Sequence, residues 1–507
     1  MAKYKYYSYD QQLMIPVSLS KQVLPKTFEY TLNVLIDEQI DLSIFEYKYS
    51  NDETGAPAYD PAILLKIILY AYSKGITGSR KIADLCRENI VCMALSADSR
   101  PHHTTIADFI SSMGKECIEL FTNILSVCYT ENLIGKNMFA IDGCKISSNC
   151  SKEWSGTKSD LLKKSEKIKK SISYLVNKHK NTDENLIDED QRDREEKSIK
   201  KLKEKAQIIT SWLKTHEDRI GVQDKPIKSN IIDNESAKMA TGHGVIQGYN
   251  GIAAVDDKHQ LIVWAETYGD ANENRHLEDA LDGIEENCRK AGIDENIYGK
   301  VTVIADTGYH SNSNMDLIQE KRIDAYIPDN QFRKRDIRFG DVGKYKKQRV
   351  ANWKPKKGKK YFKPADFHFD SITGKLICPA GFPLWCKGRN FKSSTGLTGQ
   401  AFMGHIKNCT GCKLRSKCLR NENTKARQVA IFDRVENATE KMKRKIDSPF
   451  GRSMYSKRMG TVEPVFGHIR GTKKLDRFTL RGKKKVNNQW LLYCMVHNIG
   501  KINRYGK

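Results

Sequence analysis

The sequence has 507 residues and a formal net charge of +24. At roughly 150 residues per domain, this length predicts about three domains. Hydrophobic residues make up 39% of the chain and aromatic residues 9%, which is too many for a disordered protein. No apolar run approaches the roughly 18 residues of a membrane span, and no secretory signal follows the first methionine. We therefore expect a cytoplasmic protein with no membrane partner.

The positive charge is confined to two segments. Residues 331–364 contain 14 Lys and Arg against 2 Asp and Glu, and residues 440–507 contain 18 against 4. Basic side chains gain affinity for nucleic acids by releasing the counterions condensed on phosphates. The pattern favours a polyanionic partner, and a basic surface that only aids solubility is the alternative.

The first 130 residues predict a helical N-terminal domain. Asp60 and Pro61 are suited to be the N-cap and first residue of an apolar helix over 59–72. Further helices are expected over 77–93 and from 105 onward. Short helices joined by tight turns are typical of a helix-turn-helix-like module, although packed helices are also common in proteins that do not bind DNA.

The rest of the chain predicts a mixed α/β fold with insertions. Two charged helices over 157–220 are expected to form an antiparallel hairpin, for which a solvated spacer without chemistry is the simplest interpretation. After residue 331 the regular pattern stops for about a hundred residues. One expected strand lies within 136–146 and ends at Asp142, and the others cover 244–255, 260–269, 300–305 and 324–327. The expected helices cover 273–290, 311–319, a segment near 440 and 487–499.

Three acidic residues are candidates for metal chemistry. Asp142 and Asp306 are each expected to end an apolar strand, which would place both carboxylates in one cleft. Carboxylates so placed can hold two divalent ions that activate a nucleophile and stabilise a leaving oxygen. Glu463 is the expected third acid, in the first turn of a helix that Thr461 would cap. Turn formation and capping explain most aspartates at strand ends, and an exposed salt bridge is the alternative for Glu463.

Several motifs resemble those of bacterial insertion-sequence transposases of the DDE type. They are the Asp-Gly at Asp142, IADTGYH around Asp306, and Y-x2-R-x4-E-x6-R from Tyr455 to Arg470. The segments YDPAILLKIILYAYSKGITGSRKIA, SKEWSGT, GYNGIAAVD and VNNQWLLYCMVHNIGKI resemble in particular the insertion-sequence eleven-eighty-two type. The resemblance runs from about residue 5 to residue 505.

This resemblance implies an RNase H-like catalytic core that uses Mg²⁺ or Mn²⁺. It assigns Asp142, Asp306 and Glu463 as metal-binding catalytic residues. Tyr455, Arg458 and Arg470 would match the family's Tyr-Arg-Glu-Lys signature, whose basic members contact DNA phosphates near the cut. The spacing between Arg458 and Glu463 is one residue longer than usual, and Arg470 replaces the common lysine. The implied partners are the terminal inverted repeats and target DNA, bound by a homodimer or a higher assembly.

A second constellation consists of four cysteines in a C-P-x29-C-x2-C-x5-C spacing. A C-x2-C pair with two further cysteines is suited to a structural Zn²⁺ site, and the surrounding stretch is too poor in apolar residues to build its own core. The expected ligands are Cys378, Cys409, Cys412 and Cys418, with Cys386, His368 and His405 as rivals. Reduced cysteines without metal are the alternative.

The sequence thus predicts a transposase that cuts at the ends of its element and joins the 3′-hydroxyl to target DNA. The expected domains are an N-terminal helical domain for DNA-end recognition (1–130), a catalytic core (131–150, 231–330 and 440–507), a helical-hairpin insertion (151–230) and a basic Cys-rich insertion (331–439). Within the last, Lys356, Lys357, Lys359 and Lys360 are expected to bind the DNA backbone. A nuclease without strand transfer and a non-catalytic DNA-binding repressor are the competing hypotheses.

Overall fold

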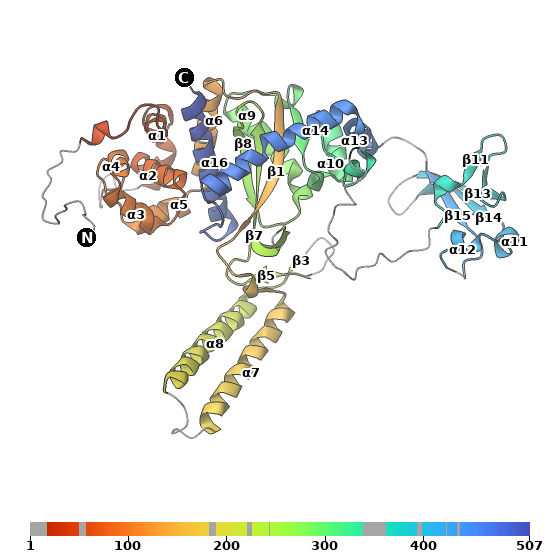
Figure 1. Ribbon diagram of the computed structural model, residues 1–507, viewed down its shortest axis with the longest axis horizontal. Helices are drawn as coiled ribbons and strands as arrows, with labels where there is room; N and C mark the ends of the chain where they lie inside the picture. Colours follow the sequence, from red (N-terminus) through yellow and green to blue (C-terminus); the bar gives the residue numbers. More distant parts are fainter. Residues whose placement is uncertain are drawn as a thin grey trace, which may run out of the picture. The chain divides into compact units, whose positions relative to one another are not determined.

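The structure is a computed structural model that describes residues 18–49, 57–181, 189–220, 226–242, 244–336, 338, 361–392, 398–421, 423–432 and 437–506. The chain forms two compact units (Figure 1). The first consists of Met1–Phe332 with Met442–Lys507, and the second of Arg333–Lys441.

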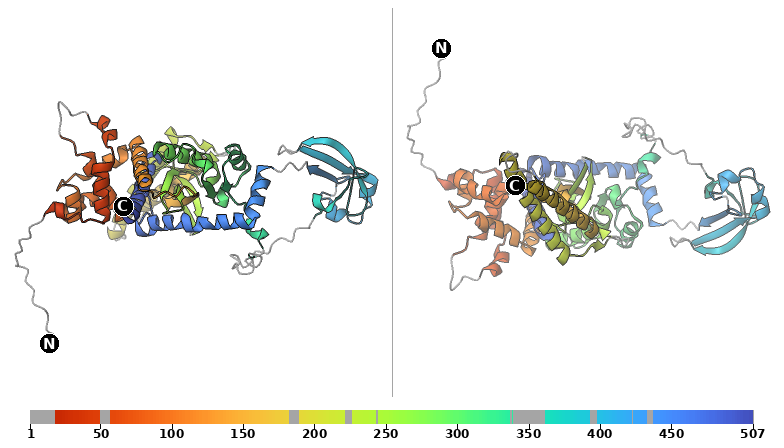
Figure 2. Two further views of the ribbon diagram at one scale, coloured as in Figure 1. Left: turned by 90° about the horizontal axis from the view of Figure 1, so that it is seen from above. Right: turned by 90° about the horizontal axis from the view of Figure 1, so that it is seen from below.

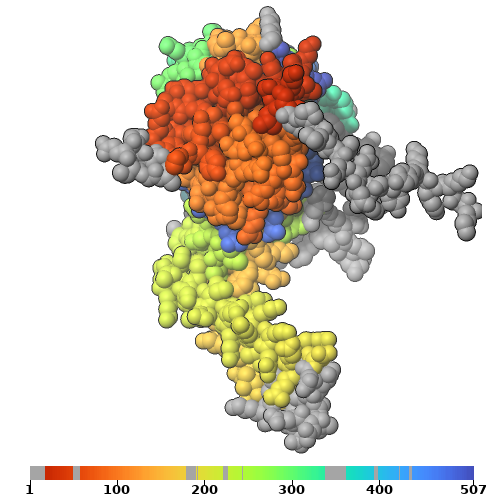
Figure 3. All heavy atoms as spheres, turned by 90° about the vertical axis from the view of Figure 1, so that its left-hand side faces the viewer, coloured from red at the N-terminus to blue at the C-terminus, as the bar shows by residue number. Residues whose placement is uncertain are grey.

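Six helices form the N-terminal part of the first unit, and Figure 3 shows their outer face in red and orange. The helix after Asp60 begins as expected, because the Asp60 carboxylate accepts a hydrogen bond from the amide of Ala62 at 2.7 Å. The single helix expected over 77–93 is wrong. Asn89 leaves the helical conformation and caps a new helix by accepting from the amide of Cys92. The helices are α1 (Phe28–Val34), α2 (Pro61–Ser73), α3 (Ser79–Glu88), α4 (Ile90–Leu95), α5 (His103–Ser112) and α6 (Lys115–Thr130).

A six-stranded mixed sheet forms the centre of this unit. Its order is β10-β9-β1-β7-β6, with β8 paired to β7. β1 runs parallel to β9 and antiparallel to β7, and the expected β7–β8 hairpin is confirmed. The strands are β1 (Met138–Ser147), β6 (Ala237–Thr241), β7 (Gly244–Asp256), β8 (Ile262–Tyr268), β9 (Thr302–Ala305) and β10 (Ala325–Tyr326).

The expectation that Asp142 ends its strand is wrong. β1 continues for five residues beyond Asp142, because Gly143–Ser147 remain paired with β7. The strand that ends beside Asp142 is β9, since the last pair between β1 and β9 is Ile141 with Ala305. The following residues, Asp142 and Asp306, are therefore neighbours across the two strands.

Helices cover both faces of the sheet (Figure 2). On one face, Trp264 fits so closely against Gly283 of α9 that a Cβ there would lie 2.0 Å from the indole nitrogen. On the other, Trp490 of α16 packs against Gly251. The faces are opposite because Gly251 and Ala254, the partner of Trp264, lie three residues apart on β7. α16 also contacts α2 and α6, so this buried helix joins the N-terminal helices to the sheet. The covering helices are α9 (Leu277–Lys290), α10 (Asn312–Glu320), α13 (Ala438–Asp447), α14 (Pro449–Thr461), α15 (Glu463–Gly467) and α16 (Lys483–Tyr505).

Contrary to the expectation, the helix that contains Glu463 does not begin with Thr461 as its N-cap. Thr461 is the last residue of α14 and its hydroxyl donates to the carbonyl of Lys457, so it is not an N-cap. Val462 interrupts the helix, and Glu463 opens α15, in the first turn as expected. A π-helical turn, η13 (His468–Thr472), follows directly.

The two charged helices between β1 and β6 lie side by side as a hairpin, as expected. They are α7 (Lys158–Asn181) and α8 (Glu189–Thr215), and Leu161, Ile209 and Trp212 form a small core at their base. Two short strand pairs, β2 (Ser155–Gly156) with β5 (Ser229–Asn230) and β3 (Arg219–Ile220) with β4 (Pro226–Ile227), stand beside it. Neither these long helices nor any other helix in the described ranges could cross a membrane.

The second unit contains a five-stranded antiparallel sheet, which corrects the expectation of an irregular segment without a core. Polar, charged and glycine residues interrupt the apolar pattern of its strands, but Leu376, Leu384, Phe402 and Val429 meet with Phe367 in a buried cluster. The strands are β11 (His368–Asp370), β12 (Lys375–Ile377), β13 (Pro383–Lys392), β14 (Thr398–Gly404) and β15 (Gln428–Phe432), and two short helices, α11 (Ile406–Thr410) and α12 (Arg415–Cys418), connect β14 to β15.

Gly248 provides a test of the β1–β7 pairing. A Cβ at this position would lie 2.1 Å from the carbonyl oxygen of Ile146, and backbone atoms cannot move aside cheaply. We expect Gly248→Ala to lower the free energy of unfolding by about 1–3 kcal/mol, measured by urea denaturation. Gly242→Ala, in the turn between β6 and β7, is the control, since a Cβ there would meet nothing within 4 Å. Equal stability of the two variants would contradict this pairing.

Candidate active site

The three acids predicted from the sequence meet around one guanidinium group. Arg458, on α14, lies 2.5 Å from Asp142 and 3.6 Å from both Asp306 and Glu463. Asp142 comes from the middle of β1, Asp306 from the end of β9 and Glu463 from the start of α15. The fold therefore brings together three carboxylates that are far apart in the sequence.

Arg458 does not face solvent as a DNA-contacting residue would. Only 8% of the residue is exposed, and both terminal nitrogens are directed at the acids. Tyr455, one turn earlier on α14, donates its hydroxyl to Asp306 at 2.9 Å. Arg470 is exposed, and its guanidinium contacts the Cys144 sulfur at 3.9 Å. Of the three predicted signature residues, Tyr455 and Arg458 thus contact the acids, and Arg470 is exposed.

Burial dominates the electrostatics of Asp142. It raises the pKa of this carboxyl to about 6, while Arg458 and the amide of Gly143 act to lower it and Asp306 acts to raise it. Burial lowers the pKa of Arg458, but Asp142 and its other neighbours reverse the shift, so the net pKa is raised and the side chain stays charged. The site therefore holds more negative charge than the single guanidinium neutralises.

A fourth acid, Glu273, was not predicted from the sequence. It opens the short helix η6 (Glu273–His276), between β8 and α9. A Cβ on Gly143 would lie 3.0 Å from one of its carboxylate oxygens, and a Cβ on Gly308 would lie 2.7 Å from the other. Burial and the charge of Asp142 raise the pKa of Glu273 to about 7, against a hydrogen bond from Asn250. Gly143 and Gly308, which follow Asp142 and Asp306, were the feature of the sequence that could have indicated a further side chain here, because they make room for Glu273.

Several buried polar atoms beside the acids, including the Nε of Arg458, have no hydrogen-bond partner within the described ranges. The Tyr309 hydroxyl is fully buried, and burial together with Glu273, Asp142 and Asp306 raises its pKa. Neither this hydroxyl nor the side-chain oxygen of Asn250 has a hydrogen-bond partner among the described residues. A buried polar atom without a partner is costly. The arrangement fits a site that accepts further polar ligands.

The donor set matches a hard divalent cation, because carboxylate oxygens are the ligands that Mg²⁺ and Mn²⁺ prefer. In the described part of the chain, however, no three acidic, histidine or cysteine side chains converge at coordination distance. In this arrangement the Arg458 guanidinium lies among the acids.

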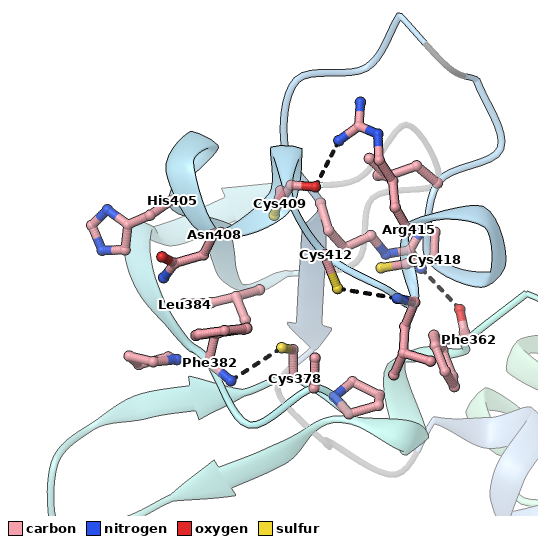
Figure 4. A pocket seen from close by; sticks show the side chains of 17 residues that line it. Phe362, Cys378, Phe382, Leu384, His405, Asn408, Cys409, Cys412, Arg415 and Cys418 are labelled. Carbon is pink, nitrogen blue, oxygen red and sulfur yellow. Dashed lines mark hydrogen bonds between the residues drawn. The ribbon is translucent and has the colours of Figure 1, made fainter.

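The four predicted zinc ligands all line one cavity of the second unit, of ≈ 40 Å³ (Figure 4). The amide of Phe382 donates to the Cys378 sulfur at 3.3 Å, and the amide of Leu414 donates to the Cys412 sulfur at 3.4 Å. Burial raises the pKa of Cys418, and the other three cysteines act on it in the same direction. His405 lines the same cavity, whereas His368 and Cys386 do not. The predicted lysines Lys356, Lys357, Lys359 and Lys360 lie outside the described residues.

Removing Arg458 tests the ion pair at the centre of the site. Arg458→Met leaves Asp142 buried without its partner, which we expect to cost about 3–5 kcal/mol of unfolding free energy at pH 8. Without Arg458, the pKa of Asp142 in the folded protein lies above the wild-type value of about 6. The loss of unfolding free energy is complete above the new pKa, where the carboxyl group is charged, and it becomes smaller at lower pH because protonation removes the charge. Urea denaturation at pH 8 and pH 5.5 measures both values.

The double variant Arg458→Met with Asp142→Asn is the control. It removes the unpaired charge and should recover part of the lost stability at pH 8. A loss that is the same at both pH values, without recovery in the double variant, would contradict the assigned pairing.

Comparison with known protein families adds two findings. Residues 377–503 match the family described as Transposase DDE domain, and residues 17–112 match the family described as Transposase domain (DUF772). The first segment contains Tyr455, Arg458, Glu463 and Arg470, and the second contains helices α1–α5. No curated protein matched the chain. The two family matches support a transposase of the DDE type with a DUF772 domain in its N-terminal part.

Proposed function

We propose that the protein cuts DNA at the ends of an insertion sequence and joins the freed 3′-hydroxyl to target DNA. The observation that carries this proposal is the convergence of Asp142, Asp306 and Glu463 on Arg458, within 3.6 Å of its guanidinium. The matches to two transposase families give the reaction class. The insertion-sequence eleven-eighty-two type remains part of the proposal.

The strand arrangement supports an RNase H-like core. β10, β9 and β1 are parallel neighbours, and the β7–β8 hairpin adds two antiparallel strands on the other side of β1. The first two acids then follow the last pair of the two central parallel strands. The helical segment with Glu463 crosses to the same place from the end of α14.

The carboxylates of Asp142, Asp306 and Glu463 would hold divalent ions, Mg²⁺ or Mn²⁺, and Glu273 lies within reach of the same place. When bound, such ions activate an attacking water or hydroxyl and stabilise the leaving oxygen. Tyr455 fixes the orientation of Asp306 through its hydroxyl. Arg458 offsets part of the negative charge of the acids, and its guanidinium would move away from them or share them with the ions. Arg470, at the exposed side, is suited to contact a DNA phosphate.

Other parts of the chain are assigned by composition and family similarity. We propose that α1–α5, which match the DUF772 family, recognise the element ends, and that residues 331–364 follow the DNA backbone. We also propose a homodimer or higher assembly, because an element has two ends to be joined. The hairpin α7–α8 remains without an assigned chemical role.

The three acids give the direct test. Replacing a carboxylate by an amide keeps the shape but removes the charge that binds the ions. We expect Asp142→Asn, Asp306→Asn and Glu463→Gln each to lower Mg²⁺-dependent cleavage and joining of a supercoiled plasmid substrate by at least about 10³-fold, while DNA binding is kept. Asp316→Asn on the exposed side of α10 is the matched control and should retain activity.

Substantial cleavage by any one variant would remove that residue from the triad. Cleavage by the wild-type protein without any joined product would favour the hydrolytic nuclease. Binding to the ends without either product would favour the repressor.

We further propose that Cys378, Cys409, Cys412 and Cys418 bind one structural Zn²⁺. Support comes from the four thiols around one cavity and from the two amide–sulfur hydrogen bonds, which direct N–H donors at two of these sulfurs. The cluster around Leu376 and Phe402 is small, so bound metal would add to the stability of this unit.

Elemental analysis of the purified full chain tests the zinc site. We expect about one zinc per chain in the wild type and none in Cys409→Ser with Cys412→Ser, which should also melt at a lower temperature. Cys386→Ser is the matched variant and should keep its zinc. Loss of zinc from Cys386→Ser would move Cys386 into the ligand set, and absence of zinc from the wild type would refute the site.

A further inference from the structure

A basic cavity of ≈ 400 Å³ lies in the first unit, between the N-terminal helices and α16. Lys74 follows α2, Lys473 follows η13, and Lys501 and Arg504 belong to the last turns of α16. No acidic residue is among those that line it. Four cationic side chains from three elements thus share one space without a negative charge.

The cations are held by aromatic rings and an amide instead of carboxylates. Lys473 lies 5.4 Å from the centre of the Phe28 ring and Lys74 lies 5.2 Å from that of Tyr70. Lys501 donates to the Gln260 side chain at 3.1 Å, and Arg504 lies against Tyr505. None of the four forms an ion pair with an acid in the described ranges.

Lys473 is the informative member of this group, because only 8% of it is exposed. Burial and the nearby Lys74 lower its pKa, just as burial and Arg504 lower that of Lys501. Burying an ammonium group without a counter-ion is expensive, and buried charges in proteins are ordinarily paired. An ordinary solvated lysine would not be held in this position.

Two histidines complete the lining of the cavity. The His497 Nε2 lies 2.8 Å from the backbone carbonyl of Gln260, which can only accept, so this nitrogen carries a hydrogen. Burial keeps the pKa of His497 low, at about 3, and its Nδ1 therefore accepts from the His468 Nδ1 at 3.2 Å. With its hydrogen on Nδ1, the neutral His468 has only an accepting Nε2 left, so the cationic side chains are the donors of this cavity.

We propose that this cavity is a binding site for a phosphate group, with Lys473 and Lys501 as its principal contacts and Lys74 and Arg504 around them. A phosphate supplies the missing negative charge and several acceptor oxygens for these donors. It can come from the DNA backbone or from a free small phosphate. The site is separate from the acidic residues and does not depend on the cleavage chemistry.

The experiment uses the full chain and the double variant Lys473→Gln with Lys501→Gln. The control is Lys200→Gln with Lys203→Gln, which removes the same charge from the exposed surface of α8. One arm measures binding of a DNA duplex by fluorescence anisotropy from 50 to 300 mM salt. The other measures binding of inorganic phosphate by calorimetry in the absence of DNA.

A DNA phosphate in the cavity is expected to make the slope of log affinity against log salt shallower by about 1 in the double variant, with no such change in the control. A free phosphate is expected to bind the wild type and the control, with at least a tenfold loss in the double variant, while the DNA slope stays unchanged. No difference from the control in either arm would overturn the proposal.

Arg504→Gln provides a second variant at the exposed rim, where folding of the interior is not at risk. Whichever measurement the double variant changes, the DNA salt slope or the phosphate affinity, Arg504→Gln should change it in the same direction by a smaller factor. Both readouts are binding equilibria, so they remain interpretable if the acids prove not to be catalytic.

Discussion

The parallel pairing of β1 with β9 is the constraint on which the candidate site depends. Its last pair, Ile141 with Ala305, determines that Asp142 and Asp306 are neighbours although the hairpin, β7, β8 and α9 lie between them in the sequence. A slip of one residue would turn every following side chain to the other face. The antiparallel pairing of β1 with β7 continues past this point and holds Asp142 in regular extended structure.

The α14–α15 segment depends on that pairing in turn. Tyr455 and Arg458 are one helical turn apart, and together they contact both strand acids. Glu463 then reaches the same guanidinium after the break at Val462. The next residue, Pro464, lines the basic cavity together with His468, so this short segment takes part in an acidic site and in a basic one. Two adjacent residues, Glu463 and Pro464, thus belong to two sites of opposite charge.

The sequence predicted the parts of this arrangement that local pattern controls. The apolar run ending at Ala305, the capping by Asp60 and the turn after Asp256 follow from short-range chemistry, and the structure has them. Where β1 ends could not be read from its residues, because pairing with β7 decides it. Glu273 was missed for a related reason, since its place among the acids is created by tertiary contacts with Gly143 and Gly308.

The sheet of the second unit shows a different limit. Four of its five strands bury at most one residue, and several contain charged or glycine residues that weaken the apolar signal. Leu384 and Phe402 become a core only when β13 and β14 pair. Burial of isolated apolar residues by pairing is a property of the folded chain and has no counterpart in the local sequence.

The connections of this second unit to the first have an evolutionary consequence. The chain leaves the first unit at Phe332, whose ring packs on Tyr455 at 5.2 Å, and returns at Met442, whose sulfur accepts from the amide of Ile327 at 3.5 Å. The points of departure and return are therefore anchored in the same neighbourhood, where a short loop could close the gap. Modules attached in this way can be gained, lost or exchanged between lineages without rebuilding their host. Relatives that lack the module altogether, or carry an unrelated one at this junction, would be compatible with the same arrangement of acids.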